Sequence, residues 1–218
     1  MARHSKANLQ HSQTSSFSFE PSPKVQALVC RWLTSQEAKD IYQQFQKSCI
    51  RNCQVLWSGM ERAQAQRWAD QRNLQTLTTA LGPLLDPSHP DCPYHPRPPS
   101  GWVRYIHGAS VIFAWYISQG DSVIVLSQPP PQRFHPSGKT FYQTIEEPII
   151  EGKMGNRPVK KIIVVHPTVG EKAEDFKYEM WPRDEVSIWT ETFGILKIVI
   201  HWRAVQGDKP RKSRKSRR

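Results

Sequence analysis

The sequence lacks the run of about 20 apolar residues that a helix needs to cross a bilayer, although hydrophobic residues make up 38% of its 218 residues. Its N-terminal stretch, MARHSKANLQHSQTSSFSF, contains no apolar segment typical of a secretory signal peptide. Cysteine is limited to Cys30, Cys49, Cys53 and Cys92, which form no CxxC pair and no zinc-site spacing with histidine. We therefore expect reduced thiols, no metal site, no membrane contact and a cytoplasmic or nuclear location.

Recognisable catalytic motifs are also missing. The 11 glycines are scattered, and no P-loop, GxGxxG, GxSxG or HExxH motif occurs, so a glycine-rich phosphate-binding loop is excluded. His107, His135, His166 and His201 match no catalytic histidine pair, and we interpret them as structural or surface residues. A histidine-dependent ribonuclease would require His107 or His166.

The positive charge lies mainly at the ends of the chain. Of the net charge of +11, residues 208–218, DKPRKSRKSRR, carry +6 and residues 1–24 carry +2, so the 183 residues between them carry only +3. The basic tail could bind nucleic acid without sequence preference or act as a nuclear-import signal. A nucleic-acid-associated protein without enzymatic activity is therefore the alternative to an enzyme.

The pattern of apolar and polar residues predicts one folded domain between two polar ends. We expect a disordered segment over 1–22, a single catalytic domain over 23–206 and a disordered basic tail over 207–218. Helices are expected over 23–49 (two), 60–73 and 102–120, with Thr34 and Glu37 at capping-box spacing. Strands are expected over 53–57, 121–127, 141–150, 159–167 and 194–202. The predicted class is α+β, with a helical N-terminal part packed on a small central sheet.

One pair of carboxylates interrupts an apolar segment. Glu146 and Glu147 lie in TFYQTIEEPII, which we interpret as a strand with Tyr142, Thr144 and Glu146 on one face. An acidic residue on a buried, aromatic face is costly unless it is paired or functional. From these residues alone, a solvated glutamate on an edge strand remains the alternative.

The order of the segments resembles the ADP-ribosyl cyclase family, which acts on NAD. That family has a strand ending in Trp-Ser, a TLEDTL-like run, a Trp-bearing helix with Ser-x-x-Phe-Ala, an alternating strand, and a segment ending in a catalytic glutamate. The corresponding segments here are VLWS at 55–58, TLTTAL at 76–81, Trp102 ahead of SVIFA at 110–114, SVIVL at 122–126 and YQTIE at 142–146. The resemblance covers roughly residues 53–166 and implies an ADP-ribosyl cyclase-like fold.

The resemblance implies a role for each matching residue. Glu146 falls on the catalytic glutamate, and Trp57 falls on the first tryptophan of the nicotinamide pocket. Trp102 or Tyr105 would supply the second aromatic wall. The remaining substrate-contacting positions fall on Ser58, Thr78, Ser110, Thr140, Phe141 and Tyr142.

The chain departs from the family at several positions. Thr78 and Thr79 replace the acidic pair of TLEDTL, Gly59 replaces the arginine after Trp-Ser, and Ile106 stands where the second tryptophan is expected. The implied reaction needs no cofactor, because NAD is the substrate. Both cyclic ADP-ribose and ADP-ribose remain open as products. Formation of the cyclic product would make the protein a transferase, and formation of ADP-ribose would make it a hydrolase.

Overall fold

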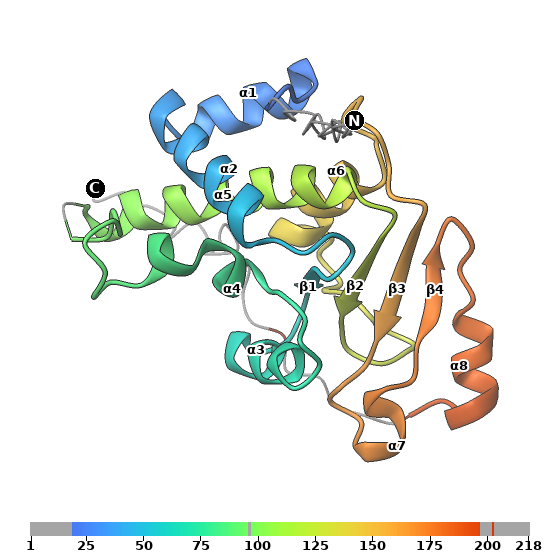
Figure 1. Cartoon of the computed structure of the whole chain (residues 1–218). Helices are drawn as coiled ribbons and strands as arrows, with labels where there is room; N and C mark the ends of the chain where they lie inside the picture. The colour runs from blue at the N-terminus through green and yellow to red at the C-terminus, as the bar shows by residue number, and fades with distance from the viewer. Residues whose placement is uncertain (1–18, 96, 197–201, 203–218) are drawn as a thin grey trace, which may run out of the picture.

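The computed structural model describes residues 19–95, 97–196 and 202, in which helices and strands alternate along the chain (Figure 1). The elements are α1 (Pro23–Trp32), α2 (Ser35–Ser48), β1 (Val55–Trp57), α3 (Arg62–Asp70), α4 (Leu77–Leu81), a 3-10 turn (Gly82–Leu85), α5 (Pro99–Ser118), β2 (Ser122–Leu126), a π-helix (Tyr142–Glu146), α6 (Glu147–Ile150), β3 (Lys161–Val165), α7 (Glu171–Glu174), β4 (Tyr178–Trp181) and α8 (Val186–Phe193). The mixed helix and strand content expected from the sequence is confirmed. Of the strand predicted over 194–202, residues 194–196 form no strand and residues 197–201 lie outside the described residues.

The four strands form one small mixed sheet in the order β1-β2-β3-β4. β1, β2 and β3 run parallel, with Trp57 opposite Leu126 and Leu126 opposite Val165, while β4 pairs antiparallel with β3. Parallel strands need helical crossovers and bury both faces, which explains the nearly continuous apolar sequences SVIVL and KIIVV. The carboxyl ends of the three parallel strands therefore meet at one edge of the sheet.

Helices α1, α2 and α5 form a layer to one side of the strands (Figure 1). The predicted capping box at the start of α2 is present: the Thr34 amide donates to Glu37 Oε2 at 2.7 Å, and the Glu37 amide donates to Thr34 Oγ1 at 3.3 Å. α5 packs closely on this layer at Gly108, where an added Cβ would lie 2.3 Å from Leu33 Cγ. Glycine at this position allows the 20-residue helix to lie against the α1–α2 connection.

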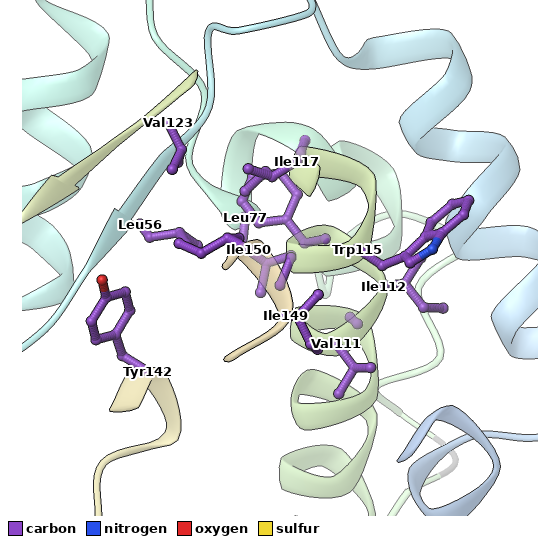
Figure 2. Close-up of a cluster of buried hydrophobic side chains, with 14 of the residues drawn as sticks. Leu56, Leu77, Val111, Ile112, Trp115, Ile117, Val123, Tyr142, Ile149 and Ile150 are labelled. Atoms are coloured by element: carbon purple, nitrogen blue, oxygen red, sulfur yellow. The ribbon is translucent and has the colours of Figure 1, made fainter. Parts of the chain in front are cut away.

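The core joins α5 to α6 and to the sheet, as Figure 2 shows. Ile149 and Ile150 of α6 are fully buried in the same cluster as Val111 and Ile112 of α5. This packing fixes the segment that carries Glu146 against the middle of α5.

The strand predicted over 141–150 is wrong, because this segment forms the π-helix and α6. Tyr142, Glu146, Ile149 and Ile150 are buried, a spacing of four, three and one residues that places them on one helical face, whereas Thr144 is exposed. Packing against α5 selects this periodicity over the alternation that the sequence also permits. The assignment of Tyr142, Thr144 and Glu146 to one strand face is therefore wrong as well.

The ends of the chain are described only in part. Phe19 packs on Tyr42 and Trp115, with ring centroids 5.1 and 5.0 Å apart, and Ser22 caps α1 by accepting a hydrogen bond from the Val25 amide at 3.3 Å. Phe19 and Ser22, which belong to the segment predicted to be disordered, thus contact the helices, while residues 1–18 and the basic tail lie outside the described residues. Within the described part of the chain, no helix has the length and apolar character needed to span a membrane.

Candidate active site

A cavity of about 340 Å³ lies where β1 ends, between the loop into α3, the start of α4, the middle of α5 and the π-helix. Ligands of sheets with parallel strands commonly bind beyond the carboxyl ends of those strands. Every site residue predicted from the sequence except Tyr105 lines this cavity: Trp57, Ser58, Thr78, Trp102, Ser110, Thr140, Phe141, Tyr142 and Glu146. The segments that carry them are up to 89 residues apart in the chain, from Trp57 to Glu146.

Glu146 is the carboxylate of the cavity. It ends the π-helix, its side chain is buried with 8% exposure, and its Oε1 accepts a short hydrogen bond from Ser110 Oγ. Burial raises the pKa of Glu146 from 4.5 to about 7, and the hydrogen bond from Ser110 opposes this rise. The carboxyl group is therefore divided between its neutral and ionised forms near neutral pH.

Aromatic side chains form the walls. Trp57, the last residue of β1, is partly exposed at the cavity, so its ring is a wall and not a fully buried core residue. Trp102 forms a second wall and stacks on Tyr105, with centroids 5.4 Å apart and an interplanar angle of 14°. Tyr105 itself is only 2% exposed and does not line the cavity. Its predicted place as a wall is wrong, because Trp102 covers it on one side and the Arg97 guanidinium lies 5.0 Å from its ring.

Ser58 lines the cavity, and its hydroxyl has no hydrogen-bond partner among the described residues. Its amide donates to the Leu126 carbonyl at 2.9 Å, which continues the pairing of β1 with β2 and fixes the residue in position. Its Oγ is buried and forms no hydrogen bond in the described structure. A buried polar atom without a partner costs about 1–3 kcal/mol, and a ligand in the cavity could supply that partner.

Thr78 reaches the cavity from the first turn of α4. Thr76 caps this helix, since its Oγ1 accepts hydrogen bonds from the amides of Thr78 and Thr79 at 3.2 and 3.4 Å. Thr79 does not line the cavity, and its hydroxyl accepts a hydrogen bond from Gln66 at 2.9 Å. Of the two threonines, only Thr78 is in a position to contact a ligand.

The neighbouring carboxylate Glu147 does not line the cavity. Burial and, next, the nearby Glu151 carboxylate raise the pKa of Glu147 to about 7. Glu146 and Glu147 therefore have similarly raised pKa values, but only Glu146 faces the cavity. This difference makes Glu147 a matched control for Glu146.

Sequence reasoning missed several lining residues, among them Gly59, Arg62, Ile106 and His107. Arg62 begins α3, only five residues after Trp57. This short separation in the sequence indicates that Arg62 lies near the wall predicted at Trp57. His107 precedes Ser110 by three residues on α5, which places both on one helical face. No short motif contains His107, and for this reason it was interpreted as structural.

His166, by contrast, is enclosed away from the cavity. It is fully buried, its Nε2 lies 2.9 Å from the Tyr178 hydroxyl, and its Nδ1 lies 3.2 Å from the Ser127 carbonyl oxygen. Burial lowers the pKa of His166 to about 4. These contacts agree with a structural role, and the predicted His201 lies outside the described residues.

The cavity combines one ionisable carboxylate with flat aromatic walls and a free hydroxyl. A carboxylate fixed in a site of low polarity stabilises positive charge that develops beside it, and aromatic faces attract a planar cation. Among residues 19–95, 97–196 and 202, no cluster of histidine, cysteine and acidic side chains could hold a metal ion. The chain matches no protein-family model, and no curated protein aligns with it significantly.

Proposed function

We propose that this protein cleaves the N-glycosidic bond of NAD, releases nicotinamide and forms ADP-ribose, cyclic ADP-ribose or both. The observation that carries the proposal is the buried Glu146 carboxylate, hydrogen-bonded by Ser110, in a cavity walled by Trp57 and Trp102. The resemblance of the segment order to the ADP-ribosyl cyclase family supports the same reaction and an ADP-ribosyl cyclase-like fold.

The chemistry of NAD matches this cavity. Cleavage of the bond between ribose C1′ and the pyridinium nitrogen sends the electron pair to that nitrogen, so nicotinamide leaves as a neutral molecule and the ribose becomes oxocarbenium-like. The ionised Glu146 would stabilise the ribose cation, as nucleophile or as electrostatic partner. The faces of Trp57 and Trp102 would hold the flat nicotinamide cation, with about 0.5–2 kcal/mol from each cation–π contact.

Hydroxyl groups would hold the polar parts of the substrate. Ser58 and Thr140 lie along the cavity as candidates for the diphosphate, while Ser110 positions Glu146. Water or the adenine of the same molecule would then capture the ribose cation, which gives ADP-ribose or its cyclic form.

The proposal is tested by incubating the purified protein with NAD and separating nicotinamide, ADP-ribose and cyclic ADP-ribose by chromatography. Wild type is expected to release nicotinamide, Glu146→Gln to lose about 10²–10³ in rate, and Glu147→Gln to retain the rate. Absence of nicotinamide release from folded wild-type protein would refute the proposed function.

The nucleic-acid alternative rests on residues 208–218, which lie outside the described residues. Deletion of these residues is expected to abolish binding to nucleic acid and to leave NAD cleavage unchanged.

We place the enzyme in the cytosol or nucleus, since all four cysteines, Cys30, Cys49, Cys53 and Cys92, are free thiols. Burial raises the pKa of Cys49 to about 11, which keeps this thiol protonated and unreactive.

A further inference from the structure

His107 is a cavity residue with unused hydrogen-bonding capacity. It lines the cavity from α5, one turn before Ser110. Its Nδ1 is buried and has no hydrogen-bond partner among the described residues. A buried polar atom without a partner is unfavourable, and the Ser58 hydroxyl of the same cavity is in that state as well.

Two aromatic neighbours fix the plane of the His107 ring. Phe141 stacks on it nearly parallel, with centroids 4.5 Å apart and an interplanar angle of 13°. Trp32 meets it edge-on, with centroids 5.0 Å apart and an angle of 79°. Because Phe141 also lines the cavity, the two stacked rings present one flat element of the wall.

The charge of His107 suits a cationic ligand. Burial lowers the pKa of His107 below its usual value, which favours the neutral imidazole. A neutral ring avoids repulsion of a pyridinium cation and offers one N–H donor and one nitrogen acceptor. A primary carboxamide offers the complementary N–H donors and a carbonyl acceptor.

We propose that a ring nitrogen of His107 recognises the carboxamide of the nicotinamide group by accepting a hydrogen bond from its N–H. This inference rests on the proposed NAD cleavage and names the residue that would distinguish nicotinamide from other pyridinium leaving groups. A role as general acid does not apply, because nicotinamide leaves as a neutral molecule and needs no proton.

The test compares NAD with the dinucleotide in which an acetyl group replaces the carboxamide, which keeps the carbonyl acceptor and loses the N–H donors. Wild type is expected to prefer NAD, and His107→Phe to lose about tenfold or more in kcat/KM for NAD with little loss for the acetyl analogue. His107→Gln retains a donor and an acceptor and is expected to keep part of the preference. His107→Leu is measured alongside, so the comparison does not depend on one variant folding.

His95→Phe is the matched control. His95 is exposed in the loop before α5, outside the cavity, and its replacement is expected to leave the preference for NAD unchanged. An equal loss with both substrates in the His107 variants would indicate a purely structural ring, and an unchanged preference would likewise overturn the inference. If wild type cleaves neither dinucleotide, the proposed function fails and this inference fails with it; NAD cleavage with an unchanged preference refutes the inference alone.

Discussion

Replacement of Glu146 by glutamine is expected to change stability and activity in opposite directions. In the folded protein the Glu146 carboxyl group keeps its proton up to about pH 7, whereas an unfolded glutamate loses it near pH 4.5. Between these values the folded state binds more protons, so the contribution of Glu146 makes the protein less stable as the pH rises from about 4.5 to about 7. Above pH 7 the full penalty for a buried carboxylate is present.

The size of this penalty follows from the raised pKa. At roughly 1.4 kcal/mol for each pH unit between 4.5 and about 7, the buried charge destabilises the fold by about 3 kcal/mol at pH 8. Glutamine removes the charge and keeps an oxygen that accepts the hydrogen bond of Ser110. We expect Glu146→Gln to be more stable than wild type by up to about 3 kcal/mol at pH 8, less any cost of the new amide N–H, and nearly equal to wild type at pH 4.

Urea unfolding at pH 4 and pH 8 measures the stability difference, and nicotinamide release measures the activity. Since the ionised form stabilises the ribose cation, kcat/KM of wild type is expected to rise with pH through about 7. Glu147→Gln should also gain stability at high pH, because burial raises the pKa of Glu147, but it should keep the activity. A Glu146→Gln variant that is less stable at pH 8 and fully active would refute this reasoning.

Three further substitutions test the walls of the cavity. Trp57→Ala is expected to raise the KM for NAD while costing less than the about 3–5 kcal/mol of a fully buried tryptophan, because the ring is partly exposed; a large fall in melting temperature with an unchanged KM would contradict its role as a wall. Thr78→Glu is expected to shift products toward linear ADP-ribose, since a carboxylate orients water better than a hydroxyl, and product chromatography with an unchanged ratio would contradict this. Gly59→Ala is expected to displace the Trp202 ring, whose nearest atom would lie 2.4 Å from the new Cβ, and to alter tryptophan fluorescence. Gly138→Ala, with a similar positive φ and no atom within 4 Å, controls for backbone strain and should leave the fluorescence unchanged.

Local signals in the sequence were sufficient for much of the fold. Thr34 and Glu37 fix the start of α2 through short-range hydrogen bonds, which depend on spacing alone. The β-branched sequences of β2 and β3 have no competing helical pattern. β4 was missed because its four residues, Tyr178–Trp181, are too few to establish alternation, and its pairing with β3 is a tertiary contact.

The 141–150 segment could not be assigned from its sequence. Its residues satisfy both a strand alternation and a helical spacing, and only the buried contacts of Ile149 and Ile150 with the α5 core distinguish the two. The same ambiguity explains Tyr105. Trp102 and Tyr105 are three residues apart on α5, and which ring faces the cavity depends on neighbours that the sequence does not place.

The position of Glu146 depends on the π-helix and on the packing that follows it. The Glu147 amide donates to the Tyr142 carbonyl, five residues back, so the turn that ends at Glu146 is wider than an α-helical turn. Pro148 has no amide hydrogen and therefore breaks the usual series of helical hydrogen bonds directly after this turn. Single π-helical turns often occur at functional sites, where they redirect a side chain.

Packing beyond the turn offsets the unfavourable burial of the carboxylate. Full burial of an isoleucine side chain contributes about 1.5–3 kcal/mol, and both Ile149 and Ile150 are fully buried. Together they contribute about 3–6 kcal/mol, which equals or exceeds the about 3 kcal/mol that the charge of Glu146 costs at pH 8. The segment can therefore hold an unfavourable carboxylate in the cavity because its next turn is anchored in the core. Truncation of either isoleucine to alanine would remove part of that compensation, and it would release Glu146 from the cavity more readily at pH 8 than at pH 4.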